Sequence, residues 1–123
     1  MVKIITFCSL IILSFSYCTK DNFRERHPIV VSSCDTAGVI SYATHIKPVL
    51  DNNCTTNCHN GIGSGHSLTA WNAVNADAVA GLLYGSVSWN GTAQQMPQGA
   101  ANKISDCDIT KIKKWAAAGA PNN

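Results

Sequence analysis

One short stretch of the sequence, NNCTTNCHNG at residues 52–61, contains three side chains that could do chemistry together. Cys54 and Cys58 are four positions apart, and His59 directly follows the second cysteine. Two thiols this close can form thioethers with the vinyl groups of a haem, and a histidine next to the second thiol can reach back to the iron. The commoner form of this motif has two residues between the cysteines, whereas this chain has three. The Cys-His adjacency still predicts one covalently attached haem c.

A haem attached in this way usually takes a second axial ligand from another part of the chain. Met96 is the only methionine besides the initiator, and it lies in the polar stretch QQMPQG, where Pro97 removes a backbone donor and stiffens the loop. A lone methionine in a polar loop gains little as core filler, so we predict that Met96 is this ligand. His45 and His66 are the alternatives, and either would lower the reduction potential relative to methionine.

Two other interpretations of the same three residues use no haem. They could hold a structural zinc ion together with Cys34 or Cys107, because thiolates and imidazoles are usual zinc ligands. Adjacent ligands are poorly placed to close a tetrahedron, however, and an exported chain tends to oxidise spare thiols. Alternatively, the cysteines could form a plain disulfide framework with His59 as a bystander. That framework would explain neither the Cys-His adjacency nor the isolated methionine.

Cys34 and Cys107 are the two remaining cysteines of the folded part. Cys34 precedes the first expected helix, and Cys107 lies in the first turn of the last one. A disulfide between them would close a loop of about 70 residues and stabilise the fold by about 4 kcal/mol in the chain-entropy model. We therefore predict this bridge, which a mass measurement with and without reductant would detect.

Residues 1–17 have the layout of a secretory signal, with a lysine near the start, an apolar run, and then small and aromatic residues. The chain could be cut after Ser16, or before Cys18 with that cysteine taking a lipid. Lipidation of Cys18 leaves four cysteines, all of which have a use above, so we favour it. Residues 18–33 would then be the lipidated cysteine and a flexible tether. The sequence thus predicts an exported, membrane-anchored lipoprotein, periplasmic or at the cell surface.

The composition allows one small domain and argues against a nucleic-acid partner. Of the 123 residues, 46% are hydrophobic and 13% are charged, which is too apolar for a disordered chain. The formal net charge is +2, and the nine Lys and Arg residues form no long run. The basic surface that nucleic acid requires is therefore missing. We assign the folded domain to residues 34–123.

The sequence of this domain predicts helices separated by loops, because strand signals are scarce and apolar residues recur at helical spacing. Ser41 would cap a first helix that leads into the Cys-His motif, and Pro48 would either kink that helix or lie in the first turn of a late-starting one. Residues 68–87 would form one helix or two short ones. Polar, glycine-containing loops are expected at 61–67 and 89–102.

The last helix has the clearest boundaries. Ser105 can cap it, Asp108 can complete a variant of the capping box, and Gly119 followed by Pro121 should end it. The apolar faces of all the expected helices should form the core. They comprise Val39, Tyr42, Ile46, Val49 and Leu50, then Leu68, Trp71, Val74, Val79, Leu82, Leu83 and Val87, and finally Ile109, Ile112 and Ala116, with Trp115 beside them.

Three pieces, IKPVLDNNCTTNCH, QQMPQG and ISDCDITKIKKWAAAGAPNN, carry a resemblance to a known family. From about Ser41 onward the chain resembles a small monohaem c-type cytochrome domain of exported bacterial proteins, in the group with an extra residue between the haem cysteines. The resemblance implies an all-α fold of three to four short helices around one covalently bound haem. It implies that Cys54 and Cys58 attach the haem and that His59 and Met96 are the proximal and distal ligands. It also implies that Cys107 pairs with an early cysteine.

The function implied by the resemblance is electron transfer rather than enzymatic catalysis. Iron with both axial positions filled has no open site for a substrate and can only change its oxidation state. The partners would be redox proteins that donate and accept electrons. A haem protein that binds gases or reduces peroxide through open iron is the alternative, and a module in which haem is a structural staple for assembly is another.

Overall fold

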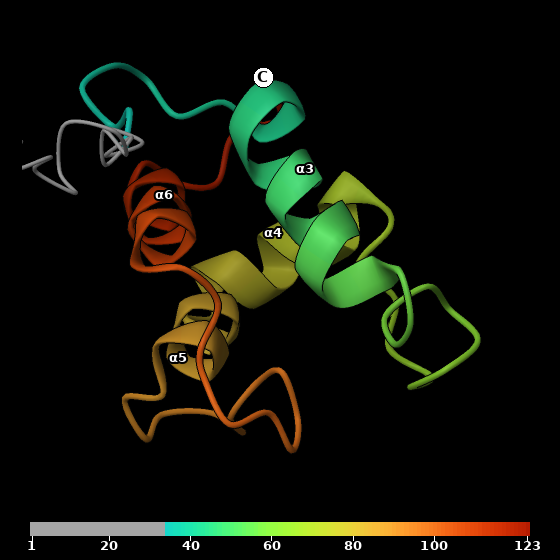
Figure 1. Cartoon of the computed structure of the whole chain (residues 1–123). Helices are drawn as coiled ribbons and strands as arrows, with labels where there is room; N and C mark the ends of the chain where they lie inside the picture. Colours follow the sequence, from blue (N-terminus) through green and yellow to red (C-terminus); the bar gives the residue numbers. More distant parts are fainter. Residues whose placement is uncertain (1–33) are drawn as a thin grey trace, which may run out of the picture. The chain divides into compact units, whose positions relative to one another are not determined.

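The structure is a computed structural model, and it describes residues 34–123. The predicted signal, the lipidated Cys18 and the tether lie outside the described residues. Figure 1 shows helical segments joined by loops, and no strand occurs in the described part. The prediction of an all-α fold is therefore confirmed for this part of the chain. None of its helices is both long and apolar enough to cross a membrane.

The first helical segment is continuous but changes its winding twice. A π-helical turn, η2 (Tyr42–Ile46), is followed by α3 (Lys47–Leu50) and by a second π-helical segment, η3 (Asp51–Thr55). Ser41 caps it as predicted, because its hydroxyl accepts the N–H of Thr44 at 3.3 Å. Pro48 is the second residue of α3 and lies inside this continuous segment, where it has no N–H to donate to the preceding turn. The π-helical turn η2 precedes it, and the helix runs through Pro48 into the Cys-His motif.

Residues 68–87 contain two short helices rather than one. Helix α4 (Trp71–Val79) and helix α5 (Leu82–Ser88) are separated by Gly81, whose φ of 78° is left-handed. The change of direction leaves Val79 and Leu82 67% and 48% exposed, so their predicted place in the core is wrong. Val39, which lies before the first helical segment, is 79% exposed and is also outside the core.

Helix α6 (Asp106–Ala117) has the predicted boundaries. The Ser105 hydroxyl accepts the N–H of Asp108 at 3.1 Å, and Gly119 follows the helix with a left-handed φ of 88°. Instead of completing the capping box through the Ser105 backbone, the Asp108 carboxylate accepts the serine hydroxyl at 2.8 Å.

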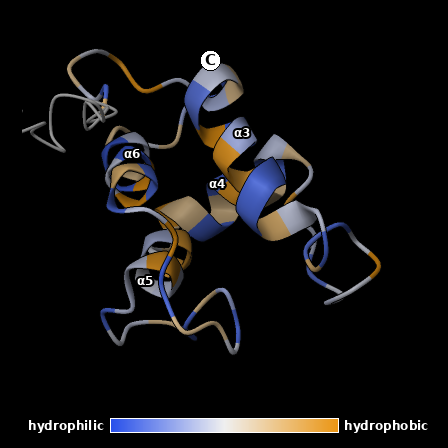
Figure 2. Ribbon diagram, viewed as in Figure 1, coloured by the Kyte–Doolittle hydropathy of each residue, from blue (hydrophilic) through white to orange (hydrophobic). Residues whose placement is uncertain are grey.

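The buried face of α6 is centred on Trp115 rather than on the neighbouring Ala116, which the sequence placed on the apolar face. Trp115, Ile112 and Ile109 are buried, whereas Ala116 is only partly so. Figure 2 shows apolar segments of the helices turned toward one another. Within residues 34–123 every buried side chain is hydrophobic. The buried hydrophobic residues are Ile40, Tyr42, Ile46, Val49, Leu50, Leu68, Val74, Ala78, Leu83, Val87, Ile104, Ile109, Ile112, Trp115 and Ala120.

Residues 120–123, here called the closing segment, bond to three helical elements. Trp71 of α4 and Trp115 of α6 donate their indole N–H groups to the carbonyls of its first two residues, at 3.1 and 3.0 Å. The N–H of Tyr42 in η2 donates to the side-chain oxygen of its last residue at 2.8 Å. The closing segment thus satisfies polar groups of helices that are distant in sequence.

The predicted disulfide between Cys34 and Cys107 is present. Its two Cα atoms are 5.3 Å apart, and the residues are separated by 73 positions in the sequence. The bridge ties the chain before the first helical segment to the first turn of α6. It therefore closes most of the described domain into one covalent loop.

Candidate cofactor site

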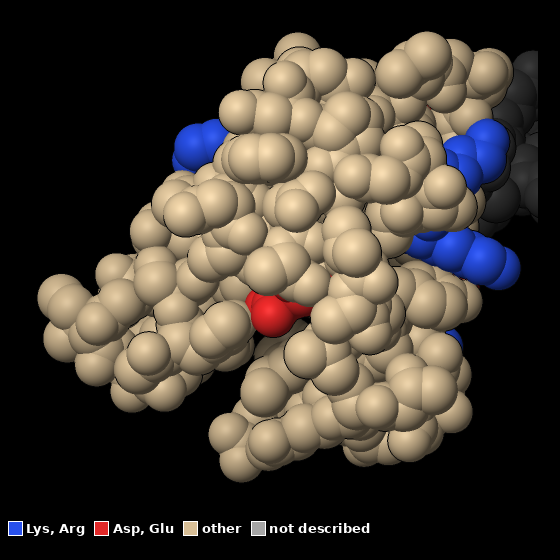
Figure 3. Space-filling model, turned by 180° about the vertical axis from the view of Figure 1, so that it is seen from behind, with Lys and Arg blue, Asp and Glu red and all other residues tan. Residues whose placement is uncertain are grey.

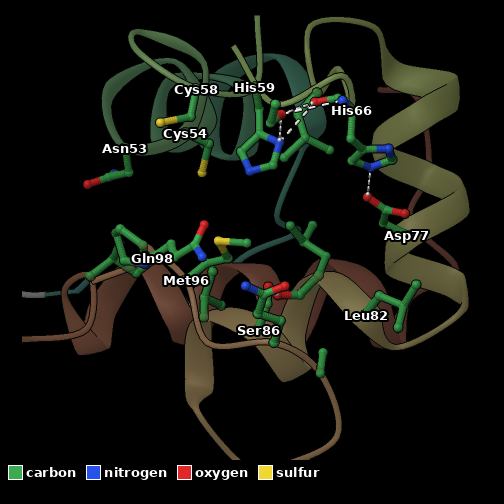
Figure 4. A pocket seen from close by; sticks show the side chains of 18 of the residues that line it. Asn53, Cys54, Cys58, His59, His66, Asp77, Leu82, Ser86, Met96 and Gln98 are labelled. Atoms are coloured by element: carbon green, nitrogen blue, oxygen red, sulfur yellow. Dashed lines mark hydrogen bonds and ion pairs between the residues drawn. The ribbon is translucent and has the colours of Figure 1, made fainter. Parts of the chain in front are cut away.

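A pocket of about 920 Å³ contains all four residues that the sequence predicts for the haem site. Cys54, Cys58, His59 and Met96 are among the residues that line it (Figure 4). Pockets for small molecules and cofactors have volumes of roughly 300–1,000 Å³, so this one is at the upper end of the range. The fold thus brings together two motifs that are almost 40 positions apart in the sequence.

Two walls face each other across the pocket. The cysteine wall consists of the lining residues between 53 and 68, from the end of η3 and the loop that follows it. The methionine wall consists of the lining residues between 82 and 104, from α5 and the loop before α6. Figure 4 shows His59 on the first wall and Met96 on the second, with the cavity between them.

His59 is oriented by the loop of its own wall. Its Nδ1 lies 2.9 Å from the carbonyl oxygen of His66 and 3.1 Å from the hydroxyl of Ser64. A carbonyl can only accept, so Nδ1 is the donor, and in the neutral imidazole this tautomer leaves the lone pair on Nε2. Figure 4 shows the ring directed into the cavity. A hydrogen bond from the other ring nitrogen is the usual support of a metal-binding histidine.

A close backbone approach holds this loop against the cysteines. The N–H of Ser64 donates to the carbonyl of Cys58 at 3.0 Å, and the N–H of Leu68 donates to the carbonyl of His59 at 2.9 Å. A Cβ atom on Gly63 would lie 2.8 Å from the Cys58 carbonyl oxygen. Glycine is therefore required here for space, and the loop follows the motif through local contacts.

The two thiols of the motif are free and differ in their surroundings. Cys58 is exposed, whereas Cys54 is partly buried and packs against the core. Burial, and to a smaller extent the neighbouring Cys58, raises the pKa of Cys54 to about 11. Because both thiols are unpaired, the plain disulfide framework does not extend to this pair.

Met96 is held on the opposite wall through its backbone. Its N–H donates to the Ser86 carbonyl of α5 at 3.1 Å, and its own carbonyl accepts the indole N–H of Trp89 at 2.8 Å. Gly85 of α5 makes room for this loop, because a Cβ there would collide with the Thr92 hydroxyl. The thioether of Met96 faces the cavity in Figure 4.

The alternative distal ligands are placed differently. His45 does not line the pocket, and its Nδ1 lies 3.1 Å from the N–H of Ser41 and 2.9 Å from the hydroxyl of Thr44. His66 lines the pocket, but it belongs to the same wall as His59, and its Nε2 lies 2.7 Å from a carboxylate oxygen of Asp77 in α4. Of the three predicted candidates, only Met96 faces His59 from the opposite wall.

The zinc interpretation loses both candidates for its fourth ligand, because Cys34 and Cys107 are bonded to each other. Within residues 34–123, no three or more His, Cys, Asp and Glu side chains are grouped so that they could hold a metal ion. Among the described residues, the Cys-His motif therefore has no cysteine available as a fourth zinc ligand.

The pocket combines an apolar floor with an almost uncharged lining. Four lining residues, Leu68, Leu83, Val87 and Ile104, are also buried members of the core. Among the described residues that line the pocket there is no Lys or Arg, and Asp77 is the only carboxylate. In Figure 3 acidic atoms lie in a hollow, whereas Lys and Arg lie toward the edges of the view.

Sequence reasoning missed three residues that shape the site. Asp77 and Ser64 bond to side chains or backbone of the cysteine wall, and Trp89 bonds to Met96. An aspartate at the middle of a helix and a tryptophan after one carry no motif, so only the fold could have identified them.

Comparisons with protein-family models, with curated proteins and with solved structures find no match for this chain.

Proposed function

We propose that residues 34–123 form an electron-transfer domain that carries one covalently attached haem. Cys54 and Cys58 form the two thioether links, and His59 and Met96 are the axial ligands. The observation that carries the proposal is that an imidazole with a free Nε2 and a thioether face each other across one pocket, with both thiols on the imidazole side. A flat cofactor with metal at its centre and reactive groups on one edge suits this donor set.

The other properties of the pocket support the same cofactor. Its volume of about 920 Å³ is sufficient for a large ring, and buried core residues form its floor. The low polarity of the floor suits the apolar body of a porphyrin, and the open rim leaves an edge accessible from outside. A low-dielectric shell around such a group also tunes its reduction potential.

The axial residues determine what the domain does. When bound, the haem supplies a one-electron change of oxidation state. His59 is held by the His66 carbonyl and keeps its Nε2 directed at one face, while Met96 supplies a soft thioether to the other face and favours the reduced form. With both faces covered by side chains, no position is left for a substrate. The domain is therefore a carrier rather than an enzyme.

The cellular context belongs to the same proposal and rests on residues 1–33. An exported chain with a lipid on Cys18 would keep the domain at a membrane surface, in the periplasm or outside the cell. Electron donors and acceptors would then be redox proteins of that compartment. The almost uncharged pocket lining gives no reason to expect a nucleic-acid partner.

The test is the intact mass of the full chain secreted from a bacterial host that matures c-type cytochromes. We expect an added mass of one haem that survives acidified organic solvent, with the visible spectrum of a haem bound through thioethers. The double variant Cys54→Ser/Cys58→Ser should lose this mass. The matched double variant Cys34→Ser/Cys107→Ser should keep it. Colourless wild-type protein, or pigment that dissolves in the acidified solvent, would refute the proposal.

A further inference from the structure

Met96 is attached to helix α5 by two hydrogen bonds that both involve its backbone. Its N–H donates to the carbonyl of Ser86, inside the helix, at 3.1 Å. Its carbonyl accepts the indole N–H of Trp89, the residue that ends the helix, at 2.8 Å. The bonds to Ser86 and Trp89 therefore fix the end of the loop formed by residues 90–95. They also hold the backbone from which the Met96 side chain projects.

The conformation of Trp89 is unusual for a bulky residue. Its φ of 57° and ψ of 36° are left-handed, a region that side chains with a Cβ rarely adopt. Such residues persist where the surrounding structure holds them, and they occur often at functional sites. Here the left-handed turn reverses the chain after α5 and brings the partly buried indole N–H to the Met96 carbonyl.

Trp89 does not line the pocket. Its effect on a bound group would therefore pass through Met96. The bond between Trp89 and Met96 also belongs to the methionine wall, which would have no covalent link to the haem because both cysteines are on the cysteine wall. We propose that Trp89 is a positioning residue, whose indole N–H holds the Met96 carbonyl and thereby keeps the thioether directed at the haem iron. This inference rests on the proposed function.

The chain provides a matched control for this hydrogen bond. Trp71 also donates its indole N–H to a backbone carbonyl, that of Ala120, at 3.1 Å, and it is also partly buried. That bond joins α4 to the closing segment, where the Ala120 carbonyl also accepts the side-chain amide of Asn75 at 2.9 Å, and neither Trp71 nor Ala120 lines the pocket. Replacing either tryptophan by phenylalanine keeps an aromatic ring and removes one donor. A general loss of stability would appear in both variants, whereas a loss of Met96 positioning would appear in one.

The test compares Trp89→Phe with Trp71→Phe in the full, haem-loaded chain. Imidazole is added to the ferric protein, and its displacement of Met96 is followed by loss of the far-red absorption band of methionine-ligated ferric haem. Removing one neutral hydrogen bond should raise the imidazole affinity about 3- to 10-fold in Trp89→Phe. In Trp71→Phe the affinity should change less than about twofold. Equal affinities in the two variants would overturn the inference.

A second measurement needs no haem. The N–H of Met96 should exchange with solvent deuterium about 3- to 10-fold faster in Trp89→Phe than in wild type, and at the wild-type rate in Trp71→Phe. If Trp89→Phe does not fold, benzothienylalanine in place of Trp89 keeps the ring shape and removes only the donor. Unchanged exchange in that protein would also overturn the inference. Absence of haem from the wild type would refute the proposed function, while this exchange test would still decide whether Trp89 holds Met96.

Discussion

The two walls of the pocket are built by different kinds of contact. On the cysteine wall, Cys58, His59, Ser64 and Leu68 are bonded to one another within a short span of sequence. On the methionine wall, Met96 is held through bonds to a helix and to a tryptophan that precede it in the chain. The sequence separations of the bonded residues are similar on the two walls, but the first wall is bonded within one loop, whereas the second is bonded to the end of helix α5.

This difference suits the two tasks that the proposed function assigns to the walls. A wall with two thioether links can hold its metal-binding histidine permanently, because thioethers do not exchange. The methionine wall has no covalent link to the haem, and it holds the Met96 ligand only through hydrogen bonds, each of which contributes about 0.5–1.5 kcal/mol. Changes on the methionine wall should therefore alter ligation without releasing the cofactor.

Among the variants that distinguish the two walls, Met96→Ala should have the largest effect. The variant should retain the haem mass, because both cysteines are intact. Its reduction potential should fall by on the order of 0.1–0.3 V, within the ~0.8 V range that axial ligands span, and its ferrous form should bind carbon monoxide rapidly. Intact mass, redox titration and the visible spectrum under carbon monoxide measure the three quantities. Loss of the haem, or an unchanged potential, would contradict the division between the walls.

The disulfide lies outside both walls and should affect stability alone. Replacing Cys34 and Cys107 by serine should lower the free energy of unfolding by about 4 kcal/mol, because the unfolded chain regains the entropy of a loop of 73 positions. Urea unfolding of the variant and wild type measures the loss. The visible spectrum of the folded variant should match wild type, and a changed axial ligation would contradict the separation of this bridge from the pocket.

Two glycines, Gly63 in the cysteine wall and Gly85 beside the methionine wall, allow the rigidity of the two walls to be compared. Gly63→Ala should cost about 2–3 kcal/mol, because its Cβ would lie 2.8 Å from the Cys58 carbonyl, which is fixed in the backbone. Gly85→Ala should cost about 1–2 kcal/mol, because its Cβ would meet the Thr92 hydroxyl and the Ala93 Cβ, which are side-chain atoms of a loop that can shift, and because alanine favours the helix. Denaturant unfolding measures both.

Gly38→Ala is the control for this pair, since nothing lies within 4 Å of its added Cβ. Its effect should be within about 0.5 kcal/mol. A Gly85→Ala variant less stable than Gly63→Ala would show that the methionine wall is the more rigid one, contrary to our interpretation.

The smallest effect concerns Cys54 in chain prepared without haem. Burial raises its pKa to about 11 from a usual value of 9.0, so the unfolded chain loses this proton first as the pH rises. Stability should be unaffected below pH 9 and should fall by about 1 kcal/mol between pH 9 and 11, after allowance for partial exposure. Unfolding curves of wild type and Cys54→Ser measure the difference, and equal declines would refute it.

The cysteine wall was the more predictable half of the site. Its thiols and imidazole were identified because they are neighbours in the sequence, and local contacts then bring them to one pocket. Their roles as haem links and ligand stay predictions. The boundaries at Ser41, Ser105 and Gly119 were also predictable, since capping depends on a few adjacent residues.

The errors arose where tertiary structure decides. Val79 and Leu82 fit a helical apolar stripe, but the left-handed Gly81 breaks that stripe, and the two residues flank the bend instead of the core. On α6 the packing centres on Trp115 rather than Ala116, because the larger ring fills the interior. Met96 could be proposed from composition alone, whereas the bond from Trp89 depends on a backbone turn that no sequence pattern indicates.

The closing segment has a consequence for how the domain comes apart. Separate oxygens of this segment accept bonds from η2, α4 and α6, so fraying of any one of these helices breaks a bond to the four residues that also anchor the other two. The helices should therefore melt as one cooperative unit, and the four residues contribute far more to that cooperativity than their small size suggests.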